Sequence, residues 1–122
     1  MHQIWAVIIS AMSRWHQGKS FIEHSVSIEH DALHVIVGLL AWLGFALISR
    51  RPLSSIWPFL WLCALILWNE AVDLWVELWP DLGMQLGEGF KDIVLTIAMP
   101  GLLMVLIGLR PALFTAERRR RR

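Results

Sequence analysis

The sequence predicts an all-α membrane protein with three transmembrane helices and an N-terminal amphipathic helix that lies in the membrane interface. The chain has 122 residues, of which 57% are hydrophobic and only 17% are charged. Soluble domains have about 45–50% apolar and about 25% charged residues. Three long apolar runs are present, and each is close to the roughly 20 residues that a helix needs to cross a bilayer. We expect a single membrane domain.

The three predicted transmembrane helices cover residues 30–49, 56–79 and 90–109. Backbone polar groups in lipid must bond within their own segment, so these runs are expected to be helical. The first run stops before Arg50, the second before Pro80 and the third before Arg110. Proline cannot continue a helix, and arginine favours water over hydrocarbon.

The first 17 residues contain an apolar stretch that is too short to span the membrane. Large apolar residues recur in it at helical spacing, opposite polar ones: Trp5, Ile8, Ile9, Met12 and Trp15. This pattern favours an amphipathic interfacial helix over residues 1–17. A signal peptide is the competing interpretation, but no basic segment precedes the apolar stretch and no small-residue cleavage site follows it.

The charges predict an orientation. If the three segments cross the membrane in alternating directions, Arg50, Arg51 and the basic tail over 110–122 lie on one side of the membrane. The positive-inside rule then places the C-terminus in the cytoplasm and the N-terminus outside. A run of five arginines at 118–122 also occurs in nucleic-acid binders, but on a membrane protein it favours a topology signal. We therefore expect membrane lipids and no nucleic acid as partners.

The second apolar run is two-sided when turned at about 100° per residue. Five tryptophans share one face: Trp57, Trp61, Trp68, Trp75 and Trp79. Three carboxylates share the other face, with Asn69 at its edge: Glu70, Asp73 and Glu77. Tryptophan favours the membrane interfaces, which does not explain Trp68 near the middle. The tryptophan face contacts either lipid or protein, as in a homo-oligomer or a larger membrane complex.

The depth of the carboxylate face indicates that it needs partners. Glu70 lies nine residues before Trp79, or roughly 13 Å deeper along a helix. A charge in the hydrocarbon costs at least about 2.5–3.5 kcal/mol, so such residues face the bundle interior. Polar residues of the other two runs lie at the same predicted end. The predicted binding set is His30, His34, Asn69, Glu70, Asp73, Glu77, Lys91, Asp92 and Thr96.

Three interpretations of this outer-leaflet set remain open. In the first it is a structural network, in which His30, His34 and Lys91 neutralise the carboxylates. In the second it holds a divalent metal, because histidine and carboxylate ligands suit zinc and other transition metals. The candidate metal ligands are His30, His34, Glu70, Asp73 and Asp92. In the third it is a proton or ligand site, and the candidate catalytic residues are Glu70, Asp73 and Asp92.

The order of polar residues also resembles that of the VanZ-like family of small bacterial membrane proteins, over about residues 30–100. The matching features are Asp31-xx-His34-xxx-Gly38, then Glu70 late in the next helix, then Asp92-xxx-Thr96. The sequence differs from that pattern in having Asp73 where glutamine is usual and threonine at position 96 where asparagine is commoner. The resemblance implies a bacterial inner-membrane protein and little about its substrate.

Two functions fit these observations. The first is a non-enzymatic membrane subunit or binding module that carries the histidine and carboxylate cluster in its outer leaflet. The alternative is a metal-dependent or acid/base membrane enzyme that acts on a lipid-linked substrate. Nucleophile-elbow and phosphate-loop motifs are absent from the sequence.

Overall fold

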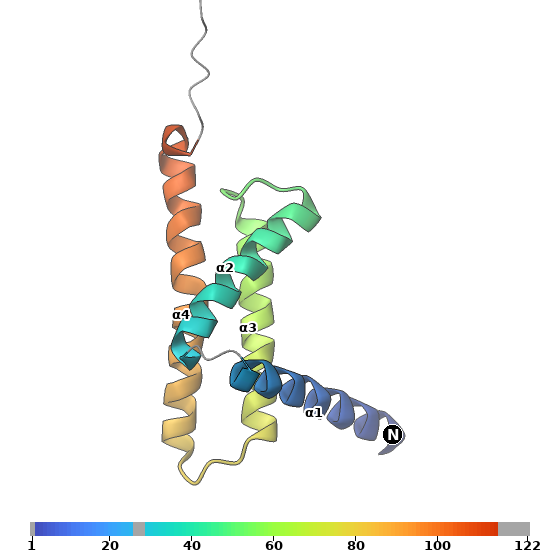
Figure 1. Ribbon diagram of the computed structural model, residues 1–122. Coiled ribbons are helices and arrows are strands. Elements are labelled where there is room, and N and C mark those ends of the chain that lie inside the picture. The colour runs from blue at the N-terminus through green and yellow to red at the C-terminus, as the bar shows by residue number, and fades with distance from the viewer. Residues whose placement is uncertain (1, 26–28, 115–122) are drawn as a thin grey trace, which may run out of the picture.

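The computed structural model describes residues 2–25 and 29–114, and these residues form four α-helices and one short 3-10 turn (Figure 1). The elements are α1 (His2–Ser25), α2 (His30–Ser49), α3 (Ile56–Val76), α4 (Leu82–Leu109) and η1 (Pro111–Leu113). Within the described residues no strand occurs, and α2, α3 and α4 are long and apolar enough to cross a membrane. The predicted all-helical fold with three membrane-spanning helices is therefore confirmed.

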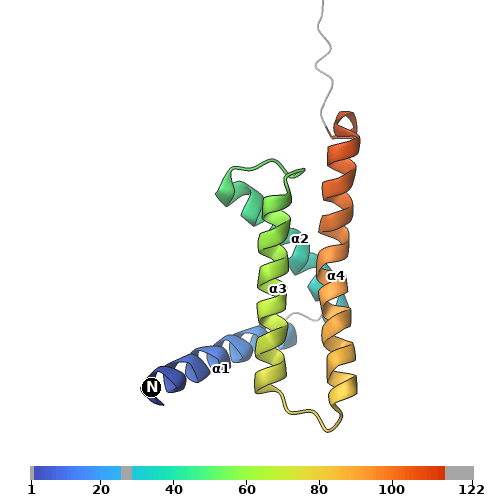
Figure 2. The ribbon, with the colours of Figure 1, turned by 180° about the vertical axis from the view of Figure 1, so that it is seen from behind.

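The helices form a three-helix bundle with α1 lying across it. Helices α3 and α4 run antiparallel, and α2 packs obliquely against both of them (Figures 1 and 2). Helix α1 contacts α3 and points away from the bundle at a steep angle to the spanning helices. This direction is the one that an interfacial helix needs, and the amphipathic interfacial role of α1 stays a prediction.

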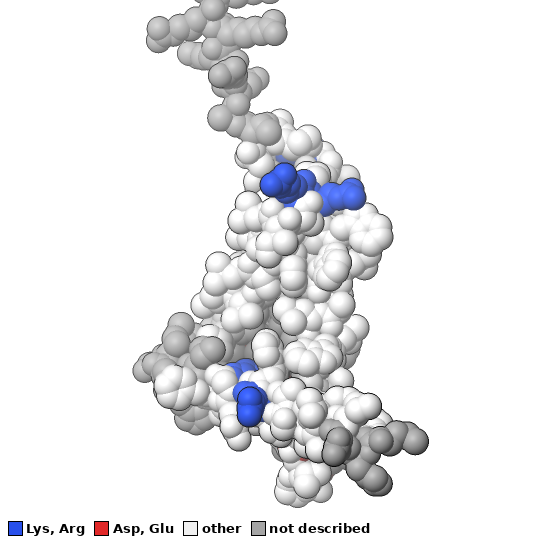
Figure 3. Space-filling view, turned by 90° about the vertical axis from the view of Figure 1, so that its right-hand side faces the viewer, with Lys and Arg blue, Asp and Glu red and all other residues white. Residues whose placement is uncertain are grey.

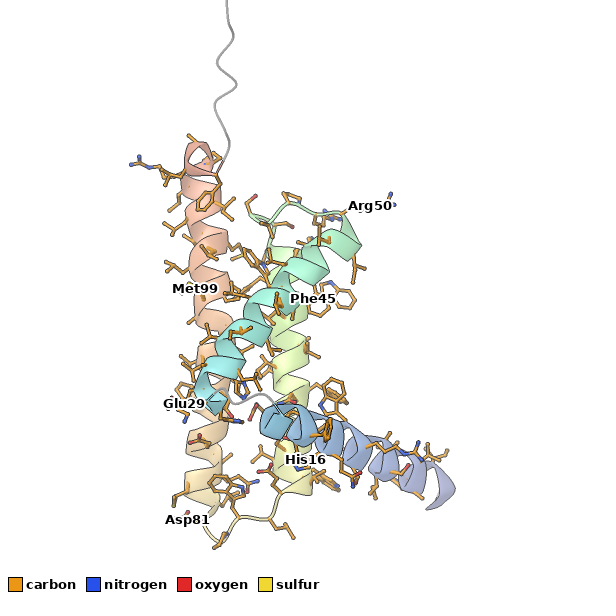
Figure 4. The ribbon with its side chains drawn as sticks, in the orientation of Figure 1. His16, Glu29, Phe45, Arg50, Asp81 and Met99 are labelled. Atoms are coloured by element: carbon orange, nitrogen blue, oxygen red, sulfur yellow. The ribbon has the colours of Figure 1, made fainter. Side chains whose placement is uncertain are left out.

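The outer surface of the bundle is that of a protein surrounded by hydrocarbon. Among the described residues the buried hydrophobic core is small and consists of Trp42, Ala46, Leu62, Ile66 and Val72. On the face shown in Figure 3, basic side chains gather at two levels, with a band of uncharged side chains between them. Arg50 lies at one end of the bundle and Asp81 at the other (Figure 4). The orientation of the termini and the inner membrane stay predictions.

The predicted helix boundaries differ from the observed ones at the end of α1 and at the start of α4. Helix α1 continues to Ser25 instead of stopping at residue 17, because its only interruption is Gly18, and one glycine costs a helix about 1 kcal/mol. Helix α4 begins at Leu82 instead of residue 90, because the Asp81 carboxylate caps it by accepting from the N–H groups of Gly83 and Met84.

Helix α3 ends at Val76 and not at residue 79. Glu77 already has an extended backbone, with φ −87° and ψ 127°. Pro80 has no N–H to bond the carbonyl of Val76 four residues earlier, and its ring would clash with that carbonyl, so it disfavours a helix that continues past Val76. Trp79 consequently belongs to the α3–α4 connection and not to the tryptophan face of the helix.

The tryptophans of α3 point away from the bundle core. Their exposed fractions lie between 40% and 66% for Trp57, Trp61, Trp68, Trp75 and the connection residue Trp79. Trp68 nevertheless has a neighbour within the chain, because its ring centroid lies 5.3 Å from that of Trp15 in α1. Helix α1 therefore accounts for the tryptophan that an interfacial belt does not explain. A role of this face in an oligomer or complex stays a prediction.

The tightest packing in the bundle is between α2 and α4, where Gly38 meets the backbone of Thr96. A Cβ atom added at Gly38 would overlap the carbonyl oxygen of Thr96. Small residues of this kind let two membrane helices approach closely. The contact sets the distance and the register between the first half of α2 and the middle of α4.

We predict that Gly38→Ala destabilises the protein by roughly 1–3 kcal/mol, because the added methyl group must push two backbones apart. The free energy of unfolding can be measured by titration with denaturing detergent. Gly44→Ala is the matched control, since a Cβ there meets nothing within 4 Å. Equal stability of the two variants would contradict the close approach of α2 and α4.

Candidate functional site

A group of polar side chains joins the start of α2 to the middle of α4, and we call it the histidine–aspartate cluster: His30, His34, Asp92 and Thr96. The two histidines are one helical turn apart, and their ring centroids are 4.8 Å from each other. The Nε2 atoms of His30 and His34 lie 3.3 and 3.5 Å from Oδ2 of Asp92. All of this geometry follows from spacings of four residues on two facing helices.

The hydrogen bonds of Thr96 fix the form of the His34 ring. The Thr96 hydroxyl donates its one hydrogen to the carbonyl oxygen of Asp92, at 2.7 Å. It must therefore accept at its 3.0 Å contact with Nδ1 of His34, so Nδ1 carries a hydrogen. In the neutral ring, Nε2 then presents a lone pair to the Asp92 carboxylate. The two acceptors repel each other unless a cation, either a proton or a metal ion, lies between them.

The second oxygen of Asp92 is also poorly satisfied. The side chain of Asp92 is only 9% exposed. Its Oδ1 atom is buried and has no hydrogen-bond partner among the residues that the structure describes. Burying an unpaired carboxylate oxygen is costly, and such an atom in a native protein calls for a bound group or a functional explanation.

A second group joins α1 to α3, and we call it the α1–α3 cluster: Trp15, His16, Lys19, Asn69, Asp73 and Glu77. The ammonium of Lys19 forms an ion pair with Oδ2 of Asp73, and Nδ1 of His16 lies 3.3 Å from Oδ1. The indole N–H of Trp15 donates to Oδ1 of Asn69 at 3.2 Å. These bonds attach α1 to the bundle and give the α3 carboxylates their partners.

Glu70 lies between the two clusters and is buried, with 7% of its surface exposed. Its Oε1 atom accepts from the side-chain amide of Asn69 at 3.1 Å. A Cβ added at Gly89 of α4 would come within 2.9 Å of its Oε2 atom. The carboxylate therefore points into the bundle, and the lack of a side chain at Gly89 makes room for it.

An acidic cavity of about 350 Å³ opens between the clusters. Its charged lining consists of five carboxylate residues and two basic ones: Glu70, Asp73, Glu77, Glu88, Asp92, Lys19 and His30. Trp79 and Gln85 of the α3–α4 turn region also line it. The excess of negative groups favours a cationic occupant over an anionic one.

The structure brings most of the predicted site residues together, but in two groups. His30, His34, Asp92 and Thr96 form one group, while Asn69, Asp73 and Glu77 belong to the other. Lys91 differs from the prediction. It does not neutralise the buried carboxylates, because its ammonium pairs with Asp31 at 2.9 Å and with Glu88 at 2.6 Å. The reason is the helical rotation, which turns Lys91 away from Asp92.

Three sets of side chains in the described part of the chain have ligand atoms within 4.8 Å of one another. They are His30–His34–Asp92, His16–Asp73–Glu77 and Asp31–Glu88–Asp92. The predicted five-residue metal set is therefore divided. Its two histidines and Asp92 converge, whereas Asp73 belongs with His16, and Glu70 is in none of the three sets.

Two functional residues of α1 were missed by the sequence analysis, namely His16 and Lys19. His16 lies inside the predicted interfacial helix over residues 1–17, and Lys19 lies beyond its predicted end. A helical continuation through this segment places His16, Lys19 and Trp15 on neighbouring turns. That spacing, together with the carboxylates of the second predicted transmembrane helix that lacked partners, was the signal in the sequence that could have identified these two residues.

Comparisons with known proteins do not place the chain in a family. A scan against family models gave no match, and searches of curated proteins and of solved structures gave none either. The resemblance to VanZ-like proteins therefore stays a prediction.

We predict that the ion pair between Lys19 and Asp73 holds α1 on the bundle. Both side chains are mostly buried. Lys19→Met should therefore lower the free energy of unfolding by more than the about 1 kcal/mol that an exposed ion pair contributes at most. The loss should approach the about 3–5 kcal/mol that follows when one partner of a buried pair is removed. Limited proteolysis within α1 would report its release. Lys91→Met is the matched control, because its ion pairs are half-exposed. Equal protease sensitivity of the two variants would contradict this role of Lys19.

Proposed function

We propose that this protein is a small membrane-embedded binding module that holds one divalent transition-metal ion in the histidine–aspartate cluster. The observation that carries the proposal is the convergence of three ligand atoms at a place that requires a positive charge. The Nε2 atoms of His30 and His34 both face Oδ2 of Asp92, and Nδ1 of His34 is already used in its bond to Thr96.

The distances support a metal as the source of that charge. Zinc binds histidine nitrogen and carboxylate oxygen at about 2.0–2.1 Å, usually with tetrahedral geometry. Two such bonds place their ligand atoms about 3.3 Å apart. The nitrogen-to-oxygen distances in the cluster, 3.3 and 3.5 Å, are close to this value.

The surroundings of the cluster support a metal in a second way. Ligating histidines commonly donate their other ring N–H to a neighbouring group, which fixes the orientation of the ring. The bond from His34 to Thr96 is of this kind. The acidic cavity beside His30 and Asp92 would attract cations and offer a path of entry.

We predict that the purified protein binds one zinc ion per chain after loading and dialysis, measured by elemental mass spectrometry. His34→Ala and Asp92→Asn should each remove the metal, because each deletes one of three ligands. His16→Ala is the matched control, since His16 belongs to the separate set with Asp73 and Glu77. Loss of zinc in His16→Ala but not in His34→Ala would place the metal elsewhere and overturn the assignment.

Thr96→Val separates a metal site from a purely structural network. Valine keeps the shape of threonine but removes the acceptor for His34. Loss of such a second-layer partner typically weakens metal binding about 10–100-fold. A variant that unfolds more readily than the wild type yet binds zinc with unchanged affinity would speak against the assigned role of Thr96.

One observation favours a second candidate, a metal-dependent enzyme that acts on a lipid-linked substrate. His30 and Asp92 line the same cavity as Glu70, so a metal held by three protein ligands would have an open position near a buried carboxylate. Catalytic zinc sites keep such an open position for water, and a nearby glutamate is a suitable general base.

We predict that Glu70→Gln distinguishes binding from catalysis, because glutamine preserves shape and removes the base. The zinc content should stay at the wild-type value in either case. The zinc-loaded protein would be reconstituted in liposomes of bacterial lipid, and lipid products would be followed by mass spectrometry. An enzyme should lose roughly 100-fold or more of its rate in Glu70→Gln. Absence of any product with the wild type would exclude this second candidate for those lipids.

A further inference from the structure

An apolar groove runs between α1, α2 and α3 on the side of the histidine–aspartate cluster away from the acidic cavity. Two adjoining cavities form it, of about 100 Å³ and about 380 Å³. Both cavities are lined by Lys19 of α1 and by Leu33 and Val37 of α2. The smaller of the two, the inner cavity, continues along α3 past Leu62 and Ile66. The larger, outer cavity lies against α1. The lining is almost wholly apolar, so the groove suits a hydrocarbon chain better than a polar ligand.

The groove has a basic end. Arg14 and Lys19 of α1 both line the outer cavity of the groove, and Gly18 lies one helical turn after Arg14. Lys19 already forms its ion pair with Asp73. Arg14 is exposed and takes part in none of the ion pairs found among the described residues. The guanidinium is therefore available for an anionic group at the mouth of the groove.

We propose that this groove binds one anionic phospholipid, with an acyl chain along α2 and α3 and the phosphate at Arg14. Helices α2 and α3 are long and apolar enough to cross a membrane, so the groove between them opens to hydrocarbon and not to water. Arginine matches the phosphate oxygens with paired N–H donors. Among the described residues no ion pair neutralises Arg14, and an unneutralised positive charge favours a net-negative headgroup over a zwitterionic one.

Gly18 gives the groove its width. It lines the outer cavity, and a Cβ added there meets nothing within 4 Å. A larger side chain at this position would occupy the space of the acyl chain without touching the protein backbone. His34 and Thr96 of the histidine–aspartate cluster line the inner cavity, so the two proposed sites adjoin. Arg14 and Gly18 lie outside that cluster, so their variants test the lipid site separately from the metal.

The test is native mass spectrometry of the full chain released from nanodiscs that contain equal amounts of phosphatidylglycerol and phosphatidylcholine. We expect one retained lipid per chain, with phosphatidylglycerol preferred. Arg14→Gln should reduce this preference roughly fivefold, as expected for one basic residue at a membrane surface. Gly18→Leu should reduce retention of both lipids.

Two matched controls locate the effect. Arg50→Gln removes an exposed arginine at the opposite end of the bundle, and Gly44→Leu adds a side chain at another glycine with open space around it. Both controls should retain lipid as the wild type does. Equal loss in Gly44→Leu and Gly18→Leu would overturn the site, and so would retention without headgroup preference. Loss of zinc binding in a variant that retains lipid would bear on the metal proposal alone.

Discussion

The contact between Gly38 and Thr96 is the constraint on which the rest of the site depends. Where the backbones of α2 and α4 touch, the side chains one and two turns earlier on α2 are held directly against α4. His34 then reaches the hydroxyl of Thr96, and His30 reaches the carboxylate of Asp92. A bundle with a wider separation here would leave the same residues several ångströms apart, and each would need its own partner in a poorly solvated place.

The second constraint is the burial of carboxylates on a helix long enough to span a membrane. Glu70 lies six residues before the end of α3, or about 9 Å inside the helix. Its neighbours Asn69 and Asp73 take their partners from α1, which crosses α3 at this level. Helix α1 is therefore part of the polar site as well as a neighbour of the bundle. It also separates the acidic cavity from the apolar groove, since Lys19 lines both.

The number of spanning helices and the burial of Glu70 were predictable from the sequence, because both follow from the energetic cost of placing polar groups in hydrocarbon. The sequence predicted that His34 shares a helix face with His30, and that Asp92 and Thr96 share a face of another helix. It did not predict which atoms of these residues bond to one another. The role of Lys19 was not predictable in this way, because α1 was expected to end before it. The partner of Lys91 was also missed, since periodicity gives the face of a residue but not which of two nearby carboxylates it meets.

The bond between His34 and Thr96 has a consequence for how the cluster exchanges ions. With Nδ1 committed to the hydroxyl, Nε2 is the ring nitrogen that faces the aspartate, 3.5 Å from its Oδ2 atom. A divalent ion bound as proposed would have this one nitrogen of the ring to bind, and it would compete with a proton for that nitrogen. The bond to Thr96 thus decides in advance which end of the imidazole is offered to an ion, so the ring would need neither rotation nor a change of tautomer when the ion binds.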